Sequence, residues 1–220
     1  MLSRHRLLML GIGLAVALCS LTLWAYKEFV PPHVENANTY PSKDAHANEH
    51  VTAAIDLYNA APKDQIFVTP YMQDDILPVL LIISNDGDQP IALKEMRAEL
   101  VTAGRAKLES LEADDVFRRV AHIDASSTNP GRVGPIPIGG PKNKKAQKQH
   151  DEITAAQFAA EAVEPHTTRS GFLFFDIADV KQPTAGAHIY LTGIRDAGGN
   201  ELLYFDIPVI ASNAAGAGQQ

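Results

Sequence analysis

The stretch ILPVLLIIS, residues 76–84, is a short, apolar and uninterrupted run. Such a run is typical of a strand that is buried on both faces of a sheet. The residues that follow it, Asn-Asp-Gly-Asp at 85–88, favour a turn because Asn, Asp and Gly tolerate a positive φ. A second strand pattern occupies residues 91–102. The sequence therefore predicts a hairpin in this region.

Strand patterns outnumber helical patterns over the rest of the chain. Alternation or dense apolar runs predict further strands at 51–57, 170–177, 188–195 and 202–210, the last two joined by the Gly-containing loop 196–200. Two short helices are expected, at 110–120 and from 151 or 152 to 161. Strands separated by turns, with only two short helices, predict a mainly β fold, an antiparallel β-sandwich.

Two stretches resemble parts of immunoglobulin-like exported bacterial domains. They are ILPVLLIISNDGDQPIAL, residues 76–93, and VEPHTTRSGFLFFDI, residues 163–177. The resemblance covers about half of the region after the N-terminal apolar segment. It implies an immunoglobulin-like fold and an extracytoplasmic setting, and it carries no catalytic residue. The antibody-type subclass is excluded, because its Cys…Trp…Cys core is missing and Trp24 lies in the apolar segment.

An uncharged run, LLMLGIGLAVALCSLTLWAY at residues 7–26, predicts one N-terminal transmembrane helix. About 20 residues at 1.5 Å each span a hydrocarbon core of about 30 Å. Arg4 and Arg6 precede the run, and Trp24 and Tyr26 close it, where aromatic rings favour the headgroup level. This arrangement places residues 1–6 in the cytoplasm and the rest of the chain across the inner membrane, in the periplasm or outside the cell.

Two other interpretations of this segment stay open. It could be a cleaved signal peptide, although Ala17-Leu18-Cys19 fits a cleavage site only in part and Leu23-Trp24-Ala25 fits it poorly. It could also be a lipoprotein signal with Cys19 acylated, which the Leu18 that precedes Cys19 disfavours. All three interpretations put the folded domain outside the cytoplasm.

Composition divides the remainder into a stalk, a domain and a tail. Residues 27–48 are polar and contain prolines, which predicts an extended stalk. The domain is expected at 49–211, with a long Gly-, Pro- and Lys-rich loop at 126–149, and residues 212–220 are expected to be disordered. The net charge of −7 disfavours nucleic-acid binding. Cys19 is the only cysteine, so the domain has no disulfide.

The sequence contains no catalytic signature, and no catalytic, cofactor-binding or metal-ligating residue is predicted. His46 and His50 are four residues apart, but the residues around them, Ala45, Ala47 and Asn48, lie in the expected stalk. His122, His150, His166 and His188 lie on different elements. The adjacent acids at 74–75, 114–115 and 151–152 point apart on a regular element. The pairs at 114–115 and 151–152 are interpreted as acids that begin a helix.

One local group of basic residues, Lys142, Lys144, Lys145 and Lys148, is a candidate contact for an anionic partner such as lipid headgroups or envelope polymers. A solvated loop is the simpler interpretation of the same residues. The sequence predicts a non-catalytic, membrane-tethered accessory protein of the cell envelope with a protein partner. The alternatives are an envelope enzyme, or a metal-binding protein, with a site assembled from the scattered histidines and acids, and a metal carrier that uses the stalk histidines.

Overall fold

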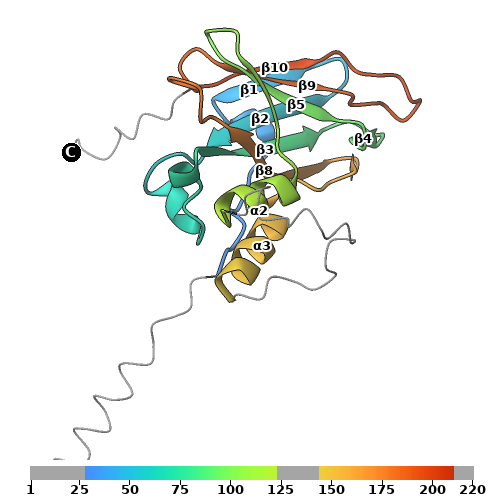
Figure 1. Cartoon of the computed structure of the whole chain (residues 1–220). Helices are drawn as coiled ribbons and strands as arrows, with labels where there is room; N and C mark the ends of the chain where they lie inside the picture. Colours follow the sequence, from blue (N-terminus) through green and yellow to red (C-terminus); the bar gives the residue numbers. More distant parts are fainter. Residues whose placement is uncertain (1–27, 123–143, 211–220) are drawn as a thin grey trace, which may run out of the picture.

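The computed structural model describes residues 28–122 and 144–210, which form two antiparallel sheets and a layer of helices (Figure 1). The strand order is β1-β2-β3-β8 in the first sheet and β10-β9-β5-β6 in the second, and β4 pairs with β7 in a short ladder. The strands are β1 (Ser42–His46), β2 (Val51–Leu57), β3 (Ile76–Asn85), β4 (Ile91–Ala92), β5 (Arg97–Val101), β6 (Lys107–Glu109), β7 (Ala162–Val163), β8 (Thr167–Asp176), β9 (His188–Thr192) and β10 (Phe205–Pro208). The 3₁₀-helices are η1 (Ala37–Thr39), η2 (Lys63–Ile66) and η3 (Tyr71–Asp74), and the α-helices are α2 (Ala113–Val120) and α3 (Lys144–Ala156).

The first sheet is buried on both faces, and this explains the apolar run of β3. One hydrophobic core fills the space between the two sheets, and a second lies between the first sheet and the helices. Side chains alternate between the two faces of a strand, so successive residues of β3 enter different cores. Those that enter the core between the sheets are Leu77, Val79, Leu81 and Ile83, and those that face the helices are Ile76, Leu80 and Ile82. The prediction of a mainly β, antiparallel fold with a doubly buried strand is confirmed.

The predicted hairpin between residues 76–84 and 91–102 is wrong. β3 pairs with β2 on one side and with β8 on the other, so no edge is left for the next strand along the chain. The turn itself is present, since the side chain of Asn85 accepts a hydrogen bond from the N–H of Gly87 at 3.0 Å. The Asn85 amide also donates to the carbonyl oxygen of Val163 at 3.1 Å, which holds the turn to β7. The chain then continues through β4 to β5, which lies in the second sheet.

The predicted stalk is also wrong for the residues that the structure describes. β1 lies within residues 27–48 and pairs with β2 from Ser42 to His46. Before it, the N–H of Ala37 donates to the hydroxyl of Ser84 at 2.8 Å, and Ala37 is fully buried. Phe29 packs on the core under the helices. The polar composition of this stretch reflects an edge strand and a capped turn, not a free linker.

Two α-helices are present in the described ranges, and the first occupies its predicted place. α2 carries Asp114 and Asp115 in its first turn and Arg118 and Arg119 in its last, as the helix dipole favours. α3 runs from Lys144 to Ala156, so it both begins and ends earlier than predicted; Lys, Gln and Ala, which fill its first turns, form helices well. The loop predicted at 126–149 is therefore wrong from residue 144 onward. Its earlier part, with Lys142, lies outside the described residues.

The second predicted hairpin is confirmed, because β9 and β10 pair in antiparallel fashion. In the loop between them, the carboxylate of Asp196 accepts a hydrogen bond from the N–H of Asn200 at 2.8 Å. The segments predicted as a cytoplasmic N-terminus (1–6), an anchor (7–26) and a tail (212–220) all fall outside the described residues. Across 28–122 and 144–210, no helix combines the length and the apolar character that crossing a membrane requires.

Candidate functional site

A cluster of aromatic rings forms the base of the candidate site, on the face of the first sheet that the helices cover. Phe172 of β8 lies at its centre, with ring centroids 4.9 Å from both Tyr58 and Phe67 in edge-to-face geometry. Phe29 stacks on Phe67 at 5.7 Å with parallel rings. Such pairs add stability beyond the area that they bury. The cluster therefore fixes the first described residues of the chain to the body of the domain.

A buried carboxylate joins α3 to this cluster. Glu152 is only 4% exposed, and its two oxygens accept hydrogen bonds from the backbone N–H groups of Val68 and Thr69, the second at 3.0 Å. A charge can remain buried only where such partners replace water. Glu152 thus ties α3 to the segment between η2 and η3.

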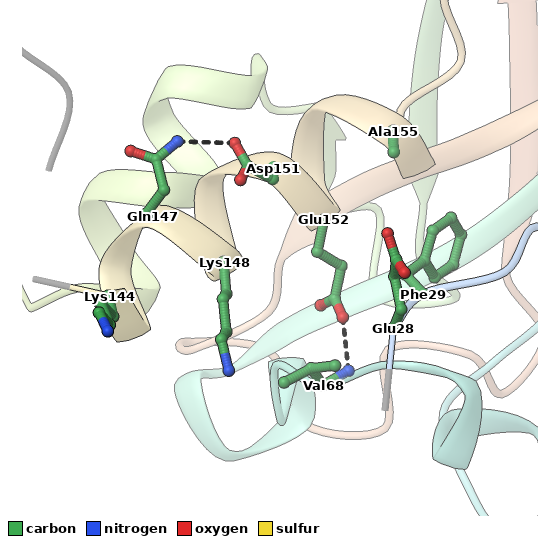
Figure 2. A pocket seen from close by; sticks show the side chains of 9 residues that line it. All are labelled: Glu28, Phe29, Val68, Lys144, Gln147, Lys148, Asp151, Glu152 and Ala155. Carbon is green, nitrogen blue, oxygen red and sulfur yellow. Dashed lines mark hydrogen bonds between the residues drawn. The ribbon is translucent and has the colours of Figure 1, made fainter. Parts of the chain in front are cut away.

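The larger cavity, about 420 Å³ in volume, opens beside this contact (Figure 2). Figure 2 shows Lys148 and Glu28 on either side of Glu152, with Val68 below the helix and Phe29 beside Glu28. Phe29, Val68 and Ala155 supply the apolar surface of the cavity, and lysine and carboxylate side chains line the rest of it. The full lining consists of Glu28, Phe29, Val68, Lys144, Gln147, Lys148, Asp151, Glu152 and Ala155.

A smaller cavity of about 180 Å³ lies on the other side of Val68, within the segment from Tyr58 to Pro78. Three polar atoms of its lining are buried: Oδ1 of Asp64, Oγ1 of Thr69 and the hydroxyl of Tyr71. The Tyr71 hydroxyl lies within hydrogen-bonding reach of Thr69 and Glu152, whereas Oδ1 of Asp64 has no such partner among the described residues. Buried polar groups are normally paired, so Asp64 marks a place where a water molecule or a small polar group would be held.

Burial raises the pKa of two tyrosines in this layer. The pKa of Tyr58 is raised to about 12, chiefly by burial and further by the negative charge of Asp56. The pKa of Tyr71 is raised more strongly, again mainly by burial and then by the nearby carboxylate of Glu152. Both phenols therefore stay neutral at physiological pH and act as uncharged parts of the cluster.

These shifts predict how stability responds to alkaline pH. A raised pKa in the folded state favours the protonated form, so the stabilisation is complete below the ordinary value of 10 and is lost as the pH rises through about 12. The free energy of unfolding should fall over this interval. In the variant Tyr58→Phe the fall should be shallower, which denaturant unfolding at a series of pH values would measure. Identical slopes for the variant and the parent protein would contradict the assignment.

The basic residues predicted from the sequence are divided between the cavity and its surroundings. Lys144 and Lys148 line the cavity and are four residues apart on α3, so their side chains lie on one face of the helix. Lys145 lies on the same helix but outside the lining, and Lys142 is outside the described residues. Asp151 accepts a hydrogen bond from the amide of Gln147 at 2.8 Å.

The histidines are spread over the domain, except that His46 and His188 come together where the edges of the two sheets meet. His122 lies 3.6 Å from Asp74, and His166 lies 3.1 Å from Asp88. His46 lies 3.5 Å from Asp44 and His188 lies 2.6 Å from Asp206, and Asp44 accepts the N–H of Asp206 at 2.8 Å. His46 stacks on the ring of Phe205 with centroids 3.9 Å apart. No group of three or more potential metal-ligating side chains occurs in the described part of the chain.

Three residues of the site escape the sequence patterns: Phe29, Val68 and Glu152. Phe29 lies in a polar, Pro-containing stretch, and Val68 is in an irregular segment. Glu152 belongs to the middle of α3 and not to its first turn, so its interpretation as an acid that begins a helix is wrong. A signal for it does exist, since Gln149, Glu152, Ile153 and Ala156 are buried on one face of α3, at the spacing of an amphipathic helix.

The cavity thus combines apolar surface with two ammonium groups and the carboxylates of Glu28, Asp151 and Glu152. This arrangement is suited to binding a partly apolar ligand. The volume of the cavity falls in the range of 300–1,000 Å³ that is usual for ligand sites. No protein-family model, curated protein or solved structure matches this chain, so its function has to be inferred from the geometry of this cavity.

Proposed function

We propose that the chain is a non-catalytic binding or accessory protein of the cell envelope, held at the inner membrane by a single-pass anchor at residues 7–26. In this proposal residues 1–6 lie in the cytoplasm and the folded domain lies on the other side of the membrane. The domain acts through the larger cavity and the face of α3 around it. Its two facing antiparallel sheets are compatible with a β-sandwich of the immunoglobulin-like class, and this class remains part of the proposal.

The observation that carries the proposal is the position of the cavity at the start of the domain. Glu28 and Phe29 form one wall of it, and they follow the predicted anchor almost directly. A binding site at this place would stay next to the membrane in every copy of the protein. A lining of apolar side chains with a few charged groups is typical of sites that recognise a ligand by contact and charge.

A photo-crosslinking amino acid at position 68 in the full-length chain would test the proposal in intact membranes. Val68 lines the cavity and is 41% exposed, whereas Leu203, at 72% exposure, lies next to β10 and supplies the control position. We expect the chain in the membrane fraction and a discrete crosslinked product from position 68 but not from position 203. Recovery of the chain in the cytosol, equal crosslinking at both positions, or a turnover activity of the pure protein would overturn the proposal.

A further inference from the structure

The folded state of residues 28–46 fixes how far the domain stands from the predicted anchor. The ring of Phe29 is held between Phe67 at 5.7 Å and Phe172 at 6.3 Å, so the chain belongs to the domain from this point. Two peptide steps separate Tyr26 from Glu28, and they can span at most about 7 Å. A chain whose anchor ends at Tyr26 therefore carries the wall of the larger cavity at the level of the lipid headgroups.

The side of the domain nearest the anchor is also the side with the candidate basic residues. The described chain starts beside α3, at the base of the helical layer (Figure 1). Lys144 and Lys148 line the cavity there, and Lys145 adds a third ammonium to the same helix. We call this the α3 face, meaning the residues that line the larger cavity, which include two lysines together with the carboxylates of Glu28, Asp151 and Glu152. Basic side chains close to a bilayer are attracted by its anionic lipids.

We propose that the α3 face docks on the membrane surface and that the larger cavity holds the headgroup of an anionic phospholipid. This inference rests on the proposed function, because it requires the anchor at residues 7–26. Lys144 and Lys148 contact the phosphate, and Phe29, Val68 and Ala155 contact the glycerol backbone and the first acyl methylenes.

The acidic groups of the lining narrow the choice of headgroup. Both oxygens of Glu152 accept backbone N–H groups, and Asp151 accepts the amide of Gln147. Glu28 stands across the cavity from Lys148 (Figure 2). A carboxylate in that position accepts hydrogen bonds from hydroxyl groups. The chemistry therefore fits a phosphate ester that bears free hydroxyls, and a phosphoglycerol headgroup has both.

The test measures how close the α3 face lies to lipid phosphorus while the anchor holds the protein in the vesicle. A nitroxide is attached to the full-length chain at Ala155→Cys or, as a control on the second sheet, at Glu109→Cys, each in a Cys19→Ser background. The vesicles contain either phosphatidylcholine alone or phosphatidylcholine with phosphatidylglycerol. Relaxation of the ³¹P signal reports proximity. We expect an enhancement several-fold larger from position 155 than from position 109, and larger with phosphatidylglycerol.

A charge-reversal pair separates the role of the lysines from that of the anchor. Lys144→Glu with Lys148→Glu should bring the enhancement from position 155 down toward that from position 109, without releasing the chain from the vesicles. Lys94→Glu with Lys107→Glu changes the net charge equally at exposed positions outside the cavity lining, and it should have little effect.

Three results would overturn the docking of the α3 face. Equal enhancement from positions 155 and 109 in a chain that is inserted would end the inference and leave the membrane-tethered function standing. The same enhancement in both lipid mixtures would exclude an anionic headgroup. A chain that does not enter vesicles at all would overturn the inference together with the proposed function.

Discussion

Replacing Phe172 by alanine should lower the free energy of unfolding by about 3–5 kcal/mol, the usual cost of removing a large aromatic side chain from a core. Phe172 is 1% exposed and lies in edge-to-face contact with Tyr58 and Phe67, both at 4.9 Å. Its loss removes buried apolar area and leaves a cavity under the helical layer, and each lost aromatic pair adds a further penalty.

The matched control is Leu203→Ala, because Leu203 is 72% exposed and should change stability by no more than about 0.5 kcal/mol. Denaturant unfolding of the full chain, followed by far-UV circular dichroism, would give both values. Phe172→Leu should fall between them, since it keeps much of the volume while losing the ring contacts. A loss below about 1 kcal/mol for Phe172→Ala would mean that the aromatic cluster does not hold the helices to the first sheet.

The strands β3 and β8 show why the position of a strand is predictable from the sequence and its pairing is not. The sequence predicts β3 and the second half of β8 because their apolar runs are continuous and covered on both faces, but it does not predict the polar start of β8 at 167–169. Pairing was not predictable from the same runs. β3 pairs along its whole length with β8, from Ile76 opposite Asp176 to Asn85 opposite Thr167. Residues 76–102 alone do not indicate that β8, which is distant in the sequence, pairs with this edge of β3 in place of the next strand.

The strand in the first described residues is not predicted from the sequence, for a related reason. Residues 42–46 carry the polar sequence Ser-Lys-Asp-Ala-His, which is typical of a linker when it is considered alone. As β1 they form the edge of the first sheet, where polar side chains are tolerated and protect the edge. Asp44 also accepts the N–H of Asp206 at 2.8 Å and so joins the edges of the two sheets. These contacts are tertiary, and the pattern of residues 27–48 does not contain them.

Of the residues that line the larger cavity, the sequence predicts only the lysines, because they form a local group of like charges. Lys144 and Lys148 were identified as a basic group, and both line the larger cavity. The apolar walls come from Phe29 and Val68, in segments far apart in the sequence, and the cavity exists only because α3 lies over both. The sequence predicts the start of this helix at residue 151 or 152, so it assigns the buried carboxylate of Glu152 to an exposed first turn.

Glu152→Ala is the second substitution with a large expected effect, and it should lower the free energy of unfolding by about 2–4 kcal/mol. The variant leaves the buried N–H of Thr69 and the neighbouring N–H of Val68 without their acceptor. An orphaned buried donor costs about 1–3 kcal/mol. The loss should also release α3 from the segment between η2 and η3. Faster hydrogen exchange of the amides of Val68 and Thr69 would report this release directly.

Asp151→Ala supplies an adjacent control on the same helix, since its side chain is 64% exposed and its partners are the amide of Gln147 at 2.8 Å and the ring of His150 at 3.8 Å. We expect a change of no more than about 0.5 kcal/mol for it. Glu152→Gln should lie between the two variants, because the amide keeps one acceptor oxygen but turns a donor toward the second N–H. If Glu152→Ala and Asp151→Ala are equally stable, the carboxylate of Glu152 does not hold α3 in place. If instead only Glu152→Ala is destabilised, one buried side chain sets both the position of α3 and the shape of the larger cavity.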